Sequence, residues 1–215
     1  MGTKAPVGLR IFQIGLWLLV LGAVVYLVLP SFLPGANQVS TPVAVSGTQS
    51  SLGPGVAMNT PFQLVNEDGK SVSEADFAGK PGAWFYGFTN CPDVCPTALA
   101  EMAALLNQLG PDAEKLNAVF VTVDPERDTL DIIKGYVDYF DPRIIGLTGE
   151  LANVQAMTKA RFVQFEKLPQ DDSAYVMQHP ASIYLVDAKG DFAGTLDAEE
   201  PMETKLGKLK KLIGV

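Results

Sequence analysis

Short apolar segments alternate with helical patterns between Phe62 and Ile213, and this alternation limits the folds that the chain can adopt. It is typical of an α/β domain, in which strands form a central sheet and helices cover it. The expected hairpins join 62–65 to 71–72 and 182–187 to 191–195. The other expected elements are strands at 83–88, 118–123, 144–147 and 162–166, and helices at 96–109, 129–140, 150–161 and 202–213.

The order of these elements indicates one arrangement in particular. Strands and helices alternate first, and a hairpin and a last helix then close the chain, which is the order of a thioredoxin-like domain. We therefore expect a thioredoxin-like central sheet flanked by helices within residues 55–215. The hydrophobic content of 47% in 215 residues is sufficient for one core of ordinary size.

A different pattern precedes this domain, an uncharged apolar run of nineteen residues from Ile11 to Leu29. At about 1.5 Å per residue, a helix of this length covers roughly 28 Å, close to the hydrocarbon thickness of a bilayer. The run is longer than the apolar region of a secretory signal peptide, and no small-residue cleavage site follows it. We therefore expect an uncleaved transmembrane signal anchor at 11–33 rather than a cleaved peptide.

Charge sets the expected orientation of this anchor. Lys4 and Arg10 are the only charged residues before it, and the next charge is Glu67, so residues 1–10 are expected in the cytoplasm. No Arg-rich and Ser-rich leader is present, which favours a bacterial inner membrane over import into an organelle. Residues 34–54 are uncharged and rich in small and polar residues, as in a flexible linker. The prediction is a single-pass protein with its C-terminal domain in the periplasm.

The expected periplasmic part is acidic. It carries 24 acidic and 14 basic residues beyond residue 54, a formal charge of −10. Nucleic acid is therefore not an expected partner. A negative surface favours solubility of an exported domain, and it also attracts cations or a basic protein surface.

The only two cysteines, Cys91 and Cys95, lie where a predicted strand ends and a helix begins. If the helix includes both, a separation of four residues places them on one face. A disulfide between them would close a loop of five residues, worth about 2 kcal/mol, so a purely structural bridge has little value. Helix N-termini stabilise thiolates, which are both metal ligands and redox nucleophiles. The pair therefore indicates metal binding or thiol chemistry.

The only histidine, His179, precedes the strand predicted at 182–187. In a thioredoxin-like topology the loop before this strand faces the cysteine turn, so the imidazole is expected near both sulfur atoms. Two thiolates and one imidazole suit Cu(I), and an added oxygen ligand or water would suit Cu(II). A structural zinc site ordinarily takes four protein ligands of these types, and the chain has three.

Several motifs identify a family resemblance. They are Phe88-Thr-Asn-Cys-Pro-Asp-Val-Cys-Pro96, Val123-Asp-Pro-Glu-Arg-Asp-Thr129, Gly146-Leu-Thr-Gly149 and His179 before Tyr184-Leu-Val-Asp187. In order and spacing, over residues 55–213, they resemble the Sco/SenC family of thioredoxin-fold copper proteins. The resemblance implies membrane-anchored copper delivery, or thiol reduction, during assembly of the copper centre of cytochrome c oxidase.

The same resemblance implies roles for individual residues. Cys91, Cys95 and His179 match the copper ligands of the family. Asp124 matches an acidic position that is thought to tune copper binding, and Asp93 lies inside the cysteine motif. Both positions have an alternative interpretation from the sequence alone. Asp124 and Asp128 are typical of a turn and a helix N-cap, and Asp93 is typical of a cap for the helix after the cysteines.

The chain departs from the family pattern beside the histidine. Gln178 and Pro180 flank His179, where relatives usually carry Asp before the histidine and Ser or Thr after it. A missing carboxylate changes the hydrogen bonding that orients an imidazole, and so changes copper affinity. Pro180 restricts His179 to extended backbone and allows a cis peptide bond.

Two functions from different classes follow from these observations. The first is a copper chaperone, not an enzyme in the usual sense, which passes copper to the copper-receiving subunit of cytochrome c oxidase. The second is a thiol-disulfide oxidoreductase that reduces the cysteine ligands of that subunit. Other copper chaperones or thioredoxin-like reductases are further expected partners. A peroxide-handling protein is a weaker third hypothesis, because the motif has no peroxidatic surroundings.

Overall fold

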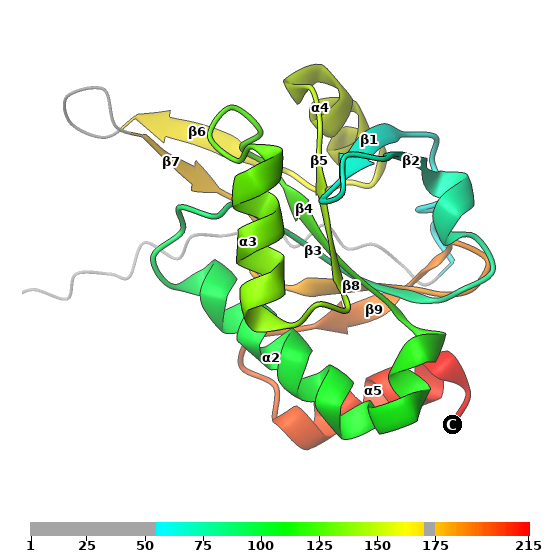
Figure 1. Cartoon of the computed structure of the whole chain (residues 1–215). Coiled ribbons are helices and arrows are strands. Elements are labelled where there is room, and N and C mark those ends of the chain that lie inside the picture. The colour runs from blue at the N-terminus through cyan, green and yellow to red at the C-terminus, as the bar shows by residue number, and fades with distance from the viewer. Residues whose placement is uncertain (1–54, 170–174) are drawn as a thin grey trace, which may run out of the picture. The chain divides into compact units, whose positions relative to one another are not determined.

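A seven-stranded mixed sheet forms the framework of the computed structural model, which describes residues 55–169 and 175–215 (Figure 1). Its strands are β1 (Gln63–Asn66), β2 (Ser71–Ser73), β3 (Gly82–Gly87), β4 (Asn117–Thr122), β5 (Ile144–Thr148), β8 (Ile183–Val186) and β9 (Phe192–Leu196). They lie in the order β2-β1-β5-β4-β3-β8-β9. The three strands β5, β4 and β3 are parallel, and the other neighbours pair antiparallel.

Four helices cover the sheet: α2 (Val94–Leu109), α3 (Leu130–Phe140), α4 (Leu151–Ala160) and α5 (Met202–Ile213). The crossovers β3–α2–β4 and β4–α3–β5 step the same way across the sheet, so their right-handed sense puts α2 and α3 on one face. Helix α5 packs beside α2 on that face, as Figure 1 shows. Two short 3-10 helices, Glu74–Phe77 and Gly110–Lys115, lie in the connections.

Strands β3 and β4 have neighbours on both sides, and all of their residues are buried. This explains why each reads as a continuous apolar run instead of an alternating one. Successive side chains of β3 point to opposite faces of the sheet. Phe85 lies on the α2 face, whereas Trp84 lies under the guanidinium of Arg161, directly after α4. Helix α4 therefore covers the opposite face.

The thioredoxin-like α/β fold expected from the sequence is confirmed. The main strands and helices begin and end within two residues of their expected bounds. The prediction of a strand at 162–166 is wrong. Phe162 has a φ of 58°, and this left-handed backbone cannot be part of a strand. Instead, β6 (Glu166–Pro169) pairs with β7 (Tyr175–Gln178) in a separate two-stranded sheet. Strand β7 was not predicted from the sequence, because it is short and has one buried residue.

The predicted membrane segment is outside the part of the chain that the structure describes. The described residues contain no helix that is both long and apolar enough to cross a bilayer. The segments 1–10, 11–33 and 34–54, for which we predict a cytoplasmic end, an anchor and a linker, precede residue 55. The anchor and its orientation therefore stay predictions.

Helix α5 is attached to α2 by a buried ion pair. The side chain of Lys205 is 1% exposed, and its Nζ lies 2.5 Å from Glu101 Oε2 and 3.3 Å from the carbonyl oxygen of Ala198. The Glu101 carboxylate is 27% exposed, so water also reaches it. A buried cation is tolerated when it is paired, and it becomes costly when its partner is removed.

This pair predicts different effects for its two members. We expect Glu101→Ala to lower the free energy of unfolding by about 3 kcal/mol, because the Lys205 cation stays buried without its carboxylate. Lys205→Met should lower the free energy of unfolding by less, because it removes the buried charge itself and keeps a side chain of similar length. Urea unfolding of both variants measures the difference. Equal losses would contradict a cost that arises from the unpaired charge.

Candidate metal centre

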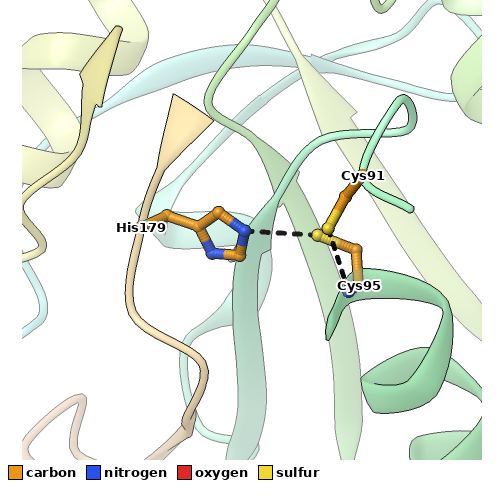
Figure 2. Close-up of side chains that lie close together, drawn as sticks. All are labelled: Cys91, Cys95 and His179. Carbon is orange, nitrogen blue, oxygen red and sulfur yellow. Dashed lines mark hydrogen bonds between the residues drawn. The ribbon is translucent and has the colours of Figure 1, made fainter. Parts of the chain in front are cut away.

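Cys91, Cys95 and His179 converge at one end of the parallel strands (Figure 2). Cys91 lies in the loop after β3, Cys95 in the first turn of α2 and His179 directly after β7. Their possible ligand atoms all lie within 4.8 Å of one another. No other group of three or more histidine, cysteine or acidic residues in residues 55–169 and 175–215 has this geometry.

Cys95 is the buried member of the group. Its Sγ accepts a hydrogen bond from the backbone N–H of Phe88 at 3.5 Å and lies 3.3 Å from His179 Nε2. The sulfur also packs against Gly87, where a Cβ atom would lie only 2.7 Å away. Glycine is therefore needed at the end of β3. Burial raises the pKa of the Cys95 thiol, so without metal it stays protonated.

Cys91 is half-buried and lies before the helix. The condition for a shared helical face is not met, because α2 begins at Val94, after Cys91. The two sulfur atoms meet for another reason. Cys91 Sγ turns back over the first turn of α2 and accepts a hydrogen bond from the backbone N–H of Cys95 at 3.5 Å. Both cysteines are free thiols in this structure.

His179 presents one particular nitrogen to the cysteines. Its Nδ1 lies 2.9 Å from the carbonyl oxygen of Pro180, and a carbonyl only accepts hydrogen bonds, so Nδ1 carries the proton. The lone pair of Nε2 then faces Cys95. Burial is the largest cause of a lowered pKa at His179, and backbone hydrogen bonds at Pro180 and Tyr86 oppose it. The imidazole is therefore a neutral, correctly oriented ligand near neutral pH.

The surroundings of His179 are aromatic. The rings of Phe85 and Phe88 meet the imidazole edge-on, with centroid distances of 5.9 and 5.6 Å. The peptide bond before Pro180 is trans, so the cis geometry considered from the sequence does not occur. The side chain of Gln178 is exposed, and within the described residues it makes no hydrogen bond to the imidazole of His179. The Pro180 carbonyl instead fixes the tautomer.

The two auxiliary acidic residues are not members of the metal-binding group. Asp93 is exposed at the N-cap position of α2 but makes no capping hydrogen bond with its side chain, so the predicted capping is wrong. Asp124 is 3% exposed and pairs with Arg127 instead of facing the cysteines. Its other carboxylate oxygen accepts a hydrogen bond from the Tyr175 hydroxyl at 2.8 Å.

Asp128 has a role that sequence reasoning missed. The N-cap of α3 is Thr129, and Asp128 is instead fully buried. Its carboxylate accepts hydrogen bonds from the backbone N–H of Thr89 at 3.0 Å and from the hydroxyls of Thr89 and Thr122, each at 2.5 Å. Burial raises its pKa. These bonds attach the loop that carries Cys91 to the end of β4, and no local spacing could reveal contacts 39 residues apart.

Comparison with known proteins agrees with this geometry. Residues 51–214 match the SCO1/SenC family. The chain belongs to the SCO1/SenC family. The match covers all of the candidate site and nearly all of the described residues.

Individual relatives of this SCO1/SenC chain include mitochondrial proteins. It is 36% identical over 137 residues to protein SCO1 homolog 1 of Arabidopsis thaliana. This alignment covers 63% of the present chain and 41% of the Arabidopsis protein. The chain is 34% identical to protein SCO2 of Saccharomyces cerevisiae, over 74% of this chain and 54% of that protein. The chain therefore spans about half the length of the curated relatives it matches.

Two solved structures are similar over nearly their whole length and are described with copper bound. Bradyrhizobium japonicum ScoI is 40% identical with a TM-score of 0.68, and the alignment covers 73% of this chain and 99% of that one. Arabidopsis thaliana ScoI is 32% identical with a TM-score of 0.68, and the alignment covers 74% of this chain and 99% of that one. The soft donor set of Cys91, Cys95 and His179 fits such a metal.

The single histidine allows a direct test of its environment. We expect the imidazole resonances of the reduced, metal-free protein to titrate below the ordinary pKa of 6.5, because burial disfavours the charged ring. The unfolded chain then binds a proton that the folded chain does not, so stability should fall as the pH drops below about 6.5. NMR titration gives the midpoint, and the urea-unfolded protein is the reference. A midpoint at or above the reference would contradict the desolvation of the half-buried imidazole.

Proposed function

We propose that this chain binds copper through Cys91, Cys95 and His179 and delivers it to the copper-receiving subunit of cytochrome c oxidase. The observation that carries the proposal is the convergence of two thiols and one imidazole nitrogen within 4.8 Å. Membership of the SCO1/SenC family supports it, as do the copper-bound structures of two relatives.

The donor set favours copper over harder metals. Thiolate and imidazole donors suit Cu(I), which accepts three ligands, and Cu(II) would need a further oxygen donor. Because metal ligands of this type are thiolates, binding releases the proton that the Cys95 thiol carries without metal. The raised pKa of Cys95 means that copper, and not the ambient pH, drives this deprotonation. Affinity should therefore increase with pH.

The difference in burial between the two cysteines suggests how copper leaves. Cys91 is half-buried, whereas Cys95 is enclosed by β3 and α2. A thiolate of the recipient can therefore approach the metal from the Cys91 side and replace this ligand first. Cys95 and His179 would hold the ion until a second recipient ligand arrives.

A copper titration tests the ligand set. We expect the reduced protein to bind one Cu(I) per chain, and His179→Ala to weaken binding by about tenfold or more, since losing even an outer-shell partner typically costs about 10–100-fold. Competition with a Cu(I)-specific chromophoric chelator measures the affinity. Gln178→Ala is the control, because this neighbouring side chain is exposed. Unchanged stoichiometry and affinity in His179→Ala would refute the three-ligand site.

A thiol-disulfide oxidoreductase is the second candidate. The two free thiols lie close enough to cycle, and the more accessible Cys91 would attack a recipient disulfide. Cys91 and Cys95 would end as a disulfide, while the recipient disulfide becomes two thiols. Rapid reduction of an oxidised dithiol peptide of the recipient, without copper and lost in Cys91→Ser, would favour this function.

We also propose that residues 11–33 anchor the protein in a bacterial inner membrane, with the copper site in the periplasm. The apolar run and the basic residues Lys4 and Arg10 support this orientation. The full chain should stay in the membrane fraction after an alkaline carbonate wash and should need detergent for release. Recovery in the washed soluble fraction would refute an uncleaved anchor.

A further inference from the structure

The position of His179 depends on a hairpin that the main sheet does not hold. Strand β7, which ends directly before His179, pairs only with β6 among the described strands. An isolated two-stranded hairpin is marginally stable in water. Side-chain contacts must therefore keep β7, and with it His179, at a fixed distance from the cysteines.

Tyr175, four residues before His179 at the start of β7, makes such contacts. Its hydroxyl donates a hydrogen bond to Asp124 Oδ1 at 2.8 Å, and its backbone carbonyl accepts one from Arg127 Nη1 at 3.2 Å. The Arg127 guanidinium lies 3.8 Å from the centroid of the Tyr175 ring. Lys167 Nζ of β6 lies at the same distance from this ring. Both the ring and the backbone of Tyr175 are thus held.

Asp124 and Arg127, two of the partners of Tyr175, belong to the hydrogen-bonded loop after β4. Asp124 is buried and ion-paired with Arg127, and its backbone N–H donates to the Thr122 hydroxyl at 2.9 Å. Its carbonyl oxygen accepts a hydrogen bond from the backbone N–H of Asp128 at 3.0 Å. The loop is therefore a fixed support for the hairpin.

The same loop approaches His179 from a second direction. The Arg127 guanidinium lies 5.6 Å from the centroid of the Phe88 ring, and this ring packs edge-on against the His179 imidazole. Arg127 thus contacts both the hairpin that carries His179 and an aromatic ring that packs against it.

We propose that Asp124, Arg127 and Tyr175 form a clasp that positions His179 against Cys95. Asp124 then acts on the metal centre through the Tyr175 hydroxyl, as a positioning residue and not as a ligand. The inference deepens the proposed copper function and rests on it for its consequence, but the geometry of the clasp is a property of the metal-free protein.

Tyr175→Phe tests the clasp because it removes one oxygen atom and keeps the ring. In the reduced, metal-free protein, Phe85 and Phe88 should shift the resonances of His179 through their ring currents. We expect Tyr175→Phe to move these resonances at least halfway to their values in the urea-unfolded protein. Tyr139→Phe is the matched control, because Tyr139 is 82% exposed, and it should leave them unchanged. Unchanged resonances in folded Tyr175→Phe would overturn the proposal.

A second measurement asks whether the clasp acts through His179. We expect Tyr175→Phe to weaken Cu(I) binding by about 10-fold in the wild-type background, at the lower end of the effect of losing a group that hydrogen-bonds a ligand, and to have no effect in a His179→Ala background. Equal weakening in both backgrounds would overturn a route through His179. A wild-type protein that binds no copper would refute the proposed function, and the metal-free resonances would still decide whether the clasp exists.

Discussion

The close packing of Cys95 against the end of β3 is the contact on which the site depends. Gly87 has no side chain, so the sulfur packs directly against the backbone of β3 and accepts a hydrogen bond from the backbone N–H of Phe88. Enclosure in this position keeps the thiol protonated until a metal replaces the proton. It also fixes the direction from which a third ligand must approach, and His179 Nε2 occupies that direction.

Two buried carboxylates attach two separate parts of the site to the loop after β4. Asp128 binds Thr89 and so holds the loop that leads to Cys91. Asp124 binds Tyr175 and so holds the hairpin that leads to His179. Both acidic residues belong to one loop, which thereby contacts both the loop that leads to Cys91 and the hairpin that leads to His179. Neither carboxylate belongs to the group of possible metal ligands.

Most of the fold could be predicted from the sequence because its main elements have strong local signals. The buried strands β3 and β4 read as apolar runs, and α5 has the period of an amphipathic helix. The hairpin of β6 and β7 could not be predicted, since Met177 is the only buried residue of its two strands and no apolar alternation marks them. Tyr175 contacts a distant loop and Met177 enters the main core, and no local pattern contains either contact.

The sequence by itself determined the chemistry of the site: two thiols and one imidazole, a strand-to-helix turn for the cysteines and a family resemblance that the comparisons confirm. Only the tertiary structure decided how these groups are used. The tautomer of His179 depends on the Pro180 carbonyl, and the meeting of the sulfur atoms depends on a backbone turn outside the helix. The roles of Asp124 and Asp128 depend on partners 51 and 39 residues away. Residue types fix which bonds a side chain can make, but burial and long-range packing decide which of them it does make.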